Sequence, residues 1–406
     1  MDIIQTFVWA VLALSAVISL HGCARFGFSP TPQQTLDGGV SVDGLGWDDA
    51  GDTHTLMADG LTDGSMDGLA DGLPVDGLPE DGPFVDAIED VAPSFDASIG
   101  DAATNLLFEL RTLSARPETF TPGVIKSGFA LRWELGDGTT IDARDVKHTY
   151  EQVGEKVVRV FSPDGGDGIT NLWAIGCQLT GRVPAGLNLL SSLRTLELWD
   201  NRLTQGIPAE LGQLSSLEVL DLGSNGLSSI IPAELGALSN LGSLYLSSNS
   251  LLGAIPPELG SLTKLENLYL SSNQLIGPIP AALGGLGGLL RMSLQSNQLN
   301  GTIPAELGQL SKLEFLWLHT NQLTGYAPGA FSGLFAIQAI QLQDNLLDQT
   351  AVDAIINDLY QDRGKHTSLS RALDIYGTNA APSVAGCAQI TVLRDTFGWF
   401  IHTSGC

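Results

Sequence analysis

The stretch LENLYLSSNQL, residues 265–275, carries the pattern that decides how residues 168–350 fold. Leucines stand at its first, fourth, sixth and eleventh positions, and Asn273 stands at its ninth. Asparagines in the same setting recur every 24 residues, and one further step back reaches a cysteine. The eight positions are Cys177, Asn201, Asn225, Asn249, Asn273, Asn297, Asn321 and Asn345. One period held over eight copies predicts an array of stacked repeats.

The spacing also predicts how each repeat is built. Leu268 and Leu270 alternate on a short strand and therefore point to the same side. Stacked repeats bury such leucines in columns, and each side chain contributes about 1.5 to 3 kcal/mol. The Asn side chain can satisfy backbone groups in the turn that leaves the strand, so neighbouring repeats should form an asparagine ladder. Cys177 fits the same slot as a small buried residue.

The second half of each repeat, such as GTIPAELG at 301–308, resembles the plant-type leucine-rich-repeat consensus Leu-x-Gly-x-Ile-Pro-x-x-Leu-Gly. This resemblance implies an α/β solenoid over residues 168–350, a horseshoe of eight repeats with a parallel concave β-sheet. Proline and glycine in this half disfavour a long helix, so we expect 3-10 or short helical turns on the convex side. For function the resemblance implies only binding, because a fold does not fix an activity.

The pattern breaks after Asn345, and residues 351–406 are predicted to cover the end of the array as a C-terminal cap. Residues 351–362 are typical of an amphipathic helix, and short runs around 373–376 and 399–401 are typical of strands. Cys387 and Cys406 are close enough in sequence to form a disulfide in an oxidising compartment, and two free thiols are the alternative.

Residues 102–167 contain short β-type runs, with Gly136-Asp137-Gly138 as a tight turn. The order of Trp133, this turn, His148-Thr149-Tyr150 and a valine-rich run at 154–160 resembles a polycystic-kidney-disease-type (PKD) domain. The resemblance implies a small β-sandwich that acts as a spacer or interaction module, although this segment is shorter than usual for that family. We interpret His148 as a structural residue.

The N-terminal sequence predicts how the protein is attached to a membrane. Residues 7–20 are all apolar or small, too few to span a bilayer comfortably but suited to a signal peptide. They lead into Leu20-His21-Gly22-Cys23, which resembles a bacterial lipobox. The resemblance implies a lipoprotein signal peptide at 1–22, lipidation of Cys23 and, from Ala24, an outer-membrane lipoprotein facing the cell surface or the periplasm. His21 and the absence of Lys or Arg from residues 1–5 depart from this pattern, so an ordinary secretory signal or a membrane helix are alternatives.

Residues 23–101 are rich in Asp-Gly pairs. Of the 45 acidic residues of the chain, 17 lie between Thr31 and Asp101, a span without Lys or Arg. Such a segment cannot bury enough apolar surface to offset its entropy, so we predict a disordered acidic linker, with calcium binding as the alternative. The chain has no basic patch for nucleic acid and is repelled by anionic lipids, so we expect membrane contact through a lipid anchor only, and a monomer.

The strand positions that alternate with the inward leucines must face the concave surface. Their aromatic and charged members are the predicted ligand-binding residues: Trp173, Glu197, Trp199, Asp221, Tyr245, Tyr269, Arg291, Phe315, Trp317 and His319. Phe315, Trp317 and His319 share one strand and are predicted to form a binding hot spot, although His319 alone is typical of an ordinary surface residue. Tyr245 and Tyr269 either bind a ligand or only pack against each other.

The sequence contains no nucleophile elbow, zinc pair or phosphate loop, and its six histidines have no metal spacing. We therefore predict that the protein is not an enzyme and uses neither cofactor nor metal. Two functions compete: adhesion to a protein ligand, and carbohydrate binding, which the PKD-like neighbour and the concave aromatics also suit. Ser, Gln and Thr among the aromatics favour a protein ligand. A purely structural role in the envelope is the third hypothesis.

Overall fold

The computed structural model describes residues 106–114, 119–126, 131–144, 146–162, 166, 168–365 and 371–406, which all belong to one compact unit. The predicted signal peptide (1–22), the lipidated Cys23 and the acidic linker (23–101) lie outside these residues and stay predictions. None of the described helices combines the length and the apolar character that crossing a membrane requires.

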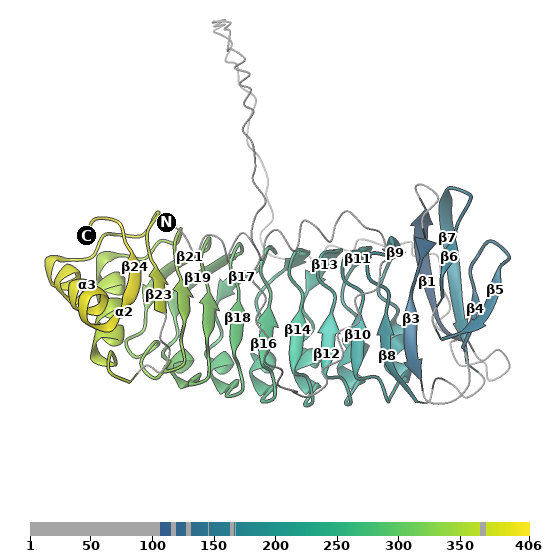
Figure 1. Cartoon of the computed structure of the whole chain (residues 1–406), viewed down its shortest axis with the longest axis horizontal. Helices are drawn as coiled ribbons and strands as arrows, with labels where there is room; N and C mark the ends of the chain where they lie inside the picture. The colour runs from purple at the N-terminus through teal and green to yellow at the C-terminus, as the bar shows by residue number, and fades with distance from the viewer. Residues whose placement is uncertain are drawn as a thin grey trace, which may run out of the picture. The chain divides into compact units, whose positions relative to one another are not determined.

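A parallel sheet runs through the repeats, each of which supplies one strand (Figure 1). Neighbouring strands pair with a 24-residue offset, so that Leu244 lies opposite Leu268. This arrangement confirms the predicted leucine-rich-repeat solenoid. The eight strands are β8 (Ile169–Trp173), β10 (Thr195–Glu197), β12 (Val219–Asp221), β14 (Ser243–Tyr245), β16 (Asn267–Tyr269), β18 (Arg291–Ser293), β20 (Phe315–Trp317) and β22 (Ala339–Gln341).

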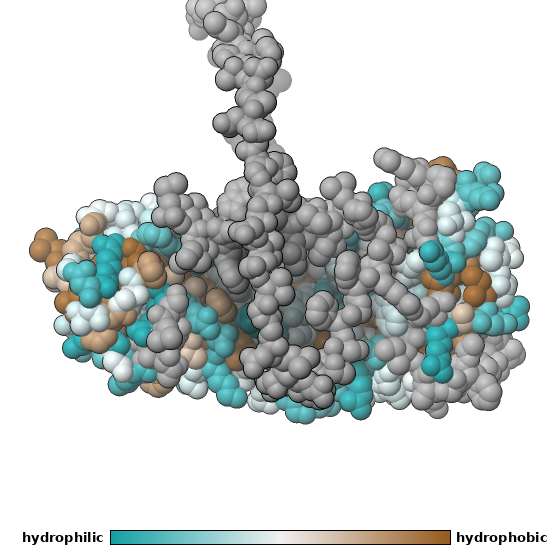
Figure 2. All heavy atoms as spheres, viewed as in Figure 1, coloured by the Kyte–Doolittle hydropathy of each residue, from teal (hydrophilic) through white to brown (hydrophobic). Residues whose placement is uncertain are grey.

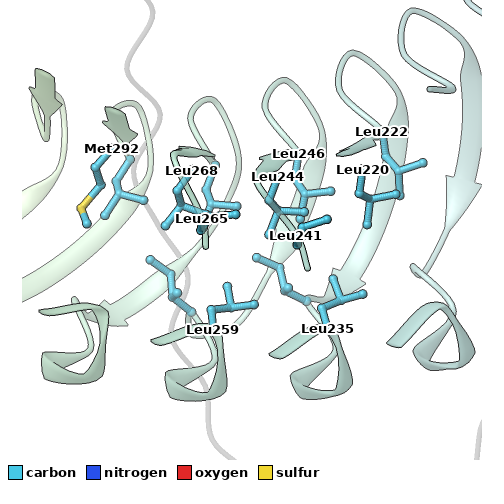
Figure 3. Close-up of a cluster of buried hydrophobic side chains, with 14 of the residues drawn as sticks. Leu220, Leu222, Leu235, Leu241, Leu244, Leu246, Leu259, Leu265, Leu268 and Met292 are labelled. Atoms are coloured by element: carbon cyan, nitrogen blue, oxygen red, sulfur yellow. The ribbon is translucent and has the colours of Figure 1, made fainter. Parts of the chain in front are cut away.

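The leucines of these strands form the core of the solenoid. In Figure 3, Leu244 and Leu268 from the sheet point toward Leu235 and Leu259 from the opposite wall, and all four are fully buried. Met292 takes the leucine position in β18 and is equally buried, as its similar volume and flexible chain allow. The face of the sheet turned away from this core is called the concave face below.

The asparagines at the 24-residue positions form a ladder along one edge of the core. The Asn249 amide nitrogen donates to the Leu222 carbonyl of the preceding repeat at 3.0 Å and to the Leu246 carbonyl of its own repeat at 3.2 Å. Its oxygen accepts from the Leu227 amide at 3.0 Å. Cys177 takes this slot in the first repeat, where it is buried and its Sγ lies 3.4 Å from the Ile175 carbonyl. Each Asn therefore links two repeats.

Short 3-10 helices form the wall opposite the sheet, as the proline and glycine pattern predicts. Each begins after a proline in extended conformation, such as Pro256 at φ −64°, and buries one leucine, such as Leu259. Proline fixes φ near this value and so favours the start of a helical turn. The helices are η1 (Ala185–Leu189), η2 (Ala209–Gln213), η3 (Ala233–Ala237), η4 (Pro257–Ser261), η5 (Ala281–Gly285) and η6 (Ala305–Gln309).

A second set of short strands follows the asparagines and covers one flank of the solenoid. These strands are β9 (Leu179–Gly181), β11 (Arg202–Gln205), β13 (Gly226–Ile230), β15 (Ser250–Leu252), β17 (Ile276–Pro278), β19 (Gln298–Ile303) and β21 (Gln322–Tyr326). At one repeat position Gly253, Gly277 and Gly301 adopt φ between 73° and 80°. Gln205 and Ser229 hold the same position at φ 66° and 84°. Backbone strain is therefore expected at these two residues.

Replacing Gln205 by glycine should raise the free energy of unfolding by up to about 1 kcal/mol, because glycine adopts positive φ without steric cost. Thermal or urea denaturation of the two proteins measures the change. Gln298→Gly is the matched control, since Gln298 is also exposed on a flank strand but is not at positive φ. The control should lose stability. A loss of stability in Gln205→Gly would show that the strain at Gln205 is negligible.

Strands from residues 106–161 cover the first repeat. β1 pairs antiparallel with β7 and also with β9, and β3 pairs antiparallel with β8, so these strands extend both sheets of the solenoid. They are hydrogen-bonded to the repeats directly. The PKD resemblance stays a prediction. The strands are β1 (Leu106–Ser114), β2 (Thr119–Phe120), β3 (Gly123–Lys126), β4 (Leu131–Glu134), β5 (Thr140–Ala143), β6 (His148–Thr149) and β7 (Gly154–Phe161).

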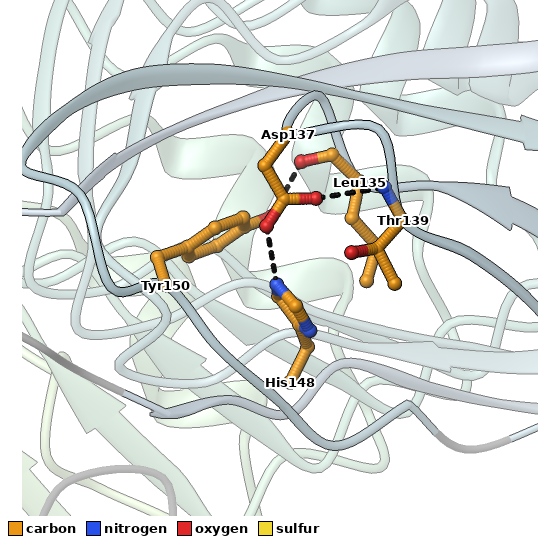
Figure 4. A network of polar contacts seen from close by, with 5 residues as sticks. All are labelled: Leu135, Asp137, Thr139, His148 and Tyr150. Atoms are coloured by element: carbon orange, nitrogen blue, oxygen red, sulfur yellow. Dashed lines mark hydrogen bonds and ion pairs between the residues drawn. The ribbon is translucent and has the colours of Figure 1, made fainter.

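The predicted Gly136-Asp137-Gly138 turn joins β4 to β5 and is held by side chains (Figure 4). Both glycines have positive φ, 75° and 92°. Asp137 accepts from the Thr139 amide at 2.9 Å and lies 2.6 Å from His148 Nε2, while the Tyr150 hydroxyl donates to the Leu135 carbonyl at 3.0 Å. Burial raises the pKa of Asp137, but the hydrogen bonds from Thr139 and His148 outweigh it and lower the pKa overall. The predicted structural role of His148 agrees with these contacts.

The concave sheet is longer than the eight strands predicted. β23 (Arg371–Asp374) pairs parallel with β22, and β24 (Trp399–His402) pairs with β23. With β3 at the other edge, the sheet has 11 strands. The predicted amphipathic helix is α2 (Gln349–Gln361), which buries Val352, Ile355, Ile356 and Leu359. It occupies the place of a 3-10 helix, so the next strand comes later in the sequence than the 24-residue period allows.

The asparagine ladder also continues into this region. Asn379 is buried, its amide nitrogen donates to the Leu342 carbonyl at 2.9 Å, and its oxygen accepts from the Leu347 amide at 3.1 Å. These bonds repeat those of Asn249 in the array. Asn379 is therefore a further rung of the ladder, and it comes later in the sequence than the 24-residue period because α2 is longer than the 3-10 helix it replaces.

Polar contacts and a disulfide fasten the C-terminal cap. Buried Asp358 of α2 accepts from the Tyr326 hydroxyl at 2.5 Å and from the Gly329 amide at 2.6 Å. Cys387, on α3 (Val384–Phe397), forms a disulfide with Cys406. Figure 2 shows hydrophobic residues at the surface of this end of the molecule, and Val384 is 91% exposed.

Candidate ligand-binding surface

Strand pairing fixes which side chains stand next to one another on the concave face. Glu197 lies between Trp173 and Asp221, and Tyr245 lies between Asp221 and Tyr269. The whole middle column is Trp173, Glu197, Asp221, Tyr245, Tyr269, Ser293, Trp317 and Gln341, in the order predicted. All of them except Ser293 are half-buried. They therefore pack against one another while part of each side chain faces solvent.

Four of the predicted residues form one continuous group, called the aromatic cluster. Tyr245 and Tyr269 lie with ring centroids 5.1 Å apart, and Tyr269 lies 6.2 Å from Trp317. Trp317 stacks on Phe315 at 5.4 Å, with an angle of 15° between the rings. Side chains from β14, β16 and β20 thus join into one apolar strip. Packing of Tyr245 against Tyr269 was one interpretation of the sequence, but contact between Tyr269 and Trp317 was not predicted.

A small residue makes this continuity possible. β18 lies between β16 and β20, and its concave position is Ser293, which is only 1% exposed. Its hydroxyl donates to the Gln295 side chain at 2.8 Å. Because serine fills little space, the rings of Tyr269 and Trp317 meet over it. A large side chain at this position would separate the tyrosines from Trp317 and Phe315.

Arg291 lies at one edge of the aromatic cluster. Its guanidinium stands 5.7 Å from the centre of the Phe315 ring and 3.9 Å from the Glu314 carboxylate. It also donates to the Asn267 side chain at 3.3 Å. Arg291 thus contacts both an aromatic ring and the carboxylate of Glu314, the residue before β20.

Glu197 and Asp221 lie on the other side of the cluster, directly opposite each other on β10 and β12. Asp221 accepts a hydrogen bond from the Gly223 amide at 3.0 Å. Burial, and then the charge of Glu197, raise the pKa of Asp221 to about 7. Burial also raises the pKa of Glu197. The two carboxylates therefore share a site that disfavours two negative charges.

The concave face ends in a polar group that sequence reasoning missed. Asp374 lies 2.6 Å from His402 Nδ1, and the Gln341 side chain donates to Asp374 at 3.4 Å. The His402 ring also meets Tyr376 edge-on at 6.4 Å. The motif LDIYGTN at 373–379 carries a weak signal for this strand, because it has the repeat pattern with one extra residue before Asn379.

The remaining predicted residues stand apart from the cluster. His319 Nδ1 lies 3.1 Å from the Thr320 hydroxyl, and burial lowers the pKa of His319 against the opposing charges of Asp344 and Asp374. Trp173 and Trp199 are half-buried, and no ring among the described residues stacks on either. Within the described part of the chain, no three His, Cys, Asp or Glu residues are placed to hold a metal ion.

Sequence comparison agrees with the fold. Residues 191–251 and 264–286 each match a family model described as leucine rich repeat. The chain therefore contains leucine-rich repeats, and these segments lie inside the solenoid. No curated protein matches the chain.

Solved leucine-rich-repeat structures resemble part of the chain. The Arabidopsis receptor kinase HAESA, in complex with the peptide hormone IDA and the co-receptor SERK1, is 35% identical over 42% of this chain and 29% of its own, with a TM-score of 0.40. The receptor kinase GASSHO1/SCHENGEN3 of Arabidopsis thaliana is 30% identical over 55% and 31%, with a TM-score of 0.42. A Leptospira interrogans LRR protein is 30% identical over 54% and 51%, with a TM-score of 0.44. The chain spans less than a third of either plant receptor.

Proposed function

We propose that this protein is a bacterial surface binding protein that holds a protein ligand on the concave face of its leucine-rich repeats. The aromatic cluster carries the proposal, because Tyr and Trp are enriched among the few residues that contribute most of the binding energy of a protein interface. Ser247 and Gln295 are half-buried, flank the strip and offer polar groups at its rim.

The ring geometry favours a protein over a glycan. A sugar stacks on flat aromatic platforms that lie in a common plane. Here the planes of Tyr245 and Tyr269 differ by 42°, and those of Tyr269 and Trp317 by 47°. A tilted, mixed surface suits the irregular side chains of a protein better. Carbohydrate binding and a structural envelope role are the alternatives that the experiment below separates from protein binding.

The cellular location is part of the same proposal. It rests on the apolar run at 7–20 and the lipobox-like Leu20-His21-Gly22-Cys23. We propose that Cys23 is lipidated and anchors the chain in the outer membrane, and that the acidic segment 23–101 acts as a spacer. The solenoid then meets its ligand at the cell surface or in the periplasm.

The test compares the full chain with a Trp199→Ala, Tyr269→Ala, Trp317→Ala variant in protein pull-downs and on a glycan array. These side chains are half-buried outside the leucine core, so the variant should still fold. Truncating a hot-spot side chain costs about 2 kcal/mol or more of binding free energy. We therefore expect that a protein captured by the wild type is not captured by the variant.

The matched control is Leu252→Ala, Ile276→Ala, which removes exposed hydrophobic side chains from the flank strands β15 and β17. This control should capture as much protein as the wild type. Equal capture by the triple variant would remove the concave face as the site. Binding to glycans alone would favour the carbohydrate alternative, and no binding at all would favour the structural one.

A further inference from the structure

The middle concave column places two carboxylates between aromatic side chains. Glu197 and Asp221 are adjacent on β10 and β12, with Trp173 before them on β8 and Tyr245 after them on β14. Trp199 follows Glu197 by two residues and so projects from the same face. The two carboxylates therefore have aromatic side chains on three sides.

Neither carboxylate is neutralised within the described part of the chain. Some other half-buried or exposed carboxylates pair with cations: Glu109 with Arg159, Glu218 with Arg194 and Glu314 with Arg291. Glu197 and Asp221 have no such ion pair among the described residues, although both are half-buried. Keeping two such groups close together without a cation costs free energy. A cation brought by a ligand would recover part of that cost.

We propose that the Glu197–Asp221 pair binds a Lys or Arg side chain of an extended polypeptide segment whose apolar residues lie on the aromatic cluster. This inference rests on the proposed function and names the chemistry of the ligand. A carboxylate pair supplies charge-assisted hydrogen bonds to an ammonium or guanidinium group. Trp and Tyr beside it favour the same groups through cation–π attraction. Charge complementarity thus selects a basic ligand.

The sheet spacing sets the length of the segment. Asp221 and Trp317 are four strands apart, so they are separated by about 19 Å at about 4.8 Å per strand. An extended chain covers that distance in about six residues at about 3.3 Å each. Arg291, at the far side of the cluster beside Phe315, disfavours a second basic residue there. The ligand is therefore oriented, with its basic residue over β10 and β12.

The carboxylate pair also makes binding depend on pH. The groups that face Asp221 are Glu197 on β10 and Tyr245 on β14, together with the Gly223 amide in its own turn. The pKa of Asp221 is about 7, and only its charged form attracts a cation. Affinity for the basic segment should therefore fall as the pH decreases through 7 and level off above it. Asp221→Asn should remove this dependence.

The experiment selects a random dodecapeptide library, displayed on phage, against the full chain at pH 8. Peptides with a Lys or Arg about six residues from an aromatic or large aliphatic residue should be enriched. A synthetic peptide from the enriched set should bind a Glu197→Gln, Asp221→Asn variant about 10- to 100-fold more weakly, the effect of losing hydrogen bonds to charged groups. Replacing its basic residue by norleucine should weaken binding to the wild type equally. Glu218→Gln, a glutamate paired with Arg194, is the control and should bind as the wild type does.

The outcomes separate the two proposals. Enrichment of apolar peptides without basic residues, lost in the Tyr269→Ala, Trp317→Ala variant, would overturn the cation site and leave the proposed function standing. Basic peptides that bind Glu197→Gln, Asp221→Asn as tightly as the wild type would also overturn it. Enrichment that is unchanged by both sets of concave variants would contradict the proposed function as well.

Discussion

Replacing Gly260 by alanine should lower the free energy of unfolding by about 3 kcal/mol, the upper part of the usual range for overpacking. Gly260 lies in η4, and a Cβ atom there would fall 2.6 Å from the carbonyl carbon of Ala282 in the next repeat and closer still to its oxygen. The obstacle is backbone, so no side chain can rotate out of the way. The two repeats would have to move apart, and the leucine columns between them would lose contact.

Urea denaturation followed by circular dichroism measures this change. Gly287→Ala is the matched control, since a Cβ at Gly287 meets no atom within 4 Å. It should leave stability unchanged or raise it by about 0.4 to 1 kcal/mol. Because each repeat contacts only its neighbours, Gly260→Ala should also broaden the transition as the two halves of the array begin to unfold separately. Equal stability of the two variants would mean that the 3-10 helices are not closely stacked in solution.

The solenoid could be predicted from the sequence because each residue type that recurs every 24 residues has a single structural role. Leu268 must be buried, Asn273 must satisfy backbone groups, and proline must start a 3-10 turn, so a 24-residue spacing fixes strand, turn and wall together. The same argument predicted which residues form the concave columns, since alternation along a strand leaves only one face for Tyr245 and Tyr269.

The two C-terminal strands were predicted, but their place in the concave sheet was not, and the reason is physical. α2 replaces a 3-10 helix and lengthens one repeat, so a search at fixed spacing ends at Asn345 although the ladder continues to Asn379. The next residue of the ladder is the next Asn whose side chain is buried in the stacked repeats, whatever its distance along the sequence. The polar group of Asp374 and His402 is consequently part of the concave face, while the sequence placed both residues in the cap.

The contacts between side chains within the site could not be predicted from the sequence either. The columns give the order of side chains, but the meeting of Tyr269 and Trp317 depends on ring orientation and on the small volume of Ser293. Likewise, Glu197 and Asp221 were predicted as ligand-binding residues, and their burial without a cation becomes evident only from the packing around them. The preference for a positively charged ligand therefore follows from the packing of these residues, and not from their order in the sequence.

Replacing Asn273 by alanine should lower the free energy of unfolding by about 3 kcal/mol, because it leaves buried backbone groups without partners. The Asn273 amide nitrogen donates to the Leu246 carbonyl of the preceding repeat at 3.0 Å and to the Leu270 carbonyl of its own at 3.1 Å. Its oxygen accepts from the Leu251 amide at 3.0 Å. Alanine offers none of these bonds, and the buried site admits no full set of replacements from solvent.

The chain itself supplies an intermediate variant. Cys177 holds the ladder position of the first repeat, where its Sγ contacts the Ile175 carbonyl. Asn273→Cys should therefore be less damaging than Asn273→Ala, and Asn300→Ala, at an exposed position of β19, should change stability by less than about 0.5 kcal/mol. The free energies of unfolding should rank wild type and Asn300→Ala first, then Asn273→Cys, then Asn273→Ala. If Asn273→Ala is as stable as Asn300→Ala, the ladder does not hold the repeats together, and the leucine columns alone must account for the stability of the solenoid.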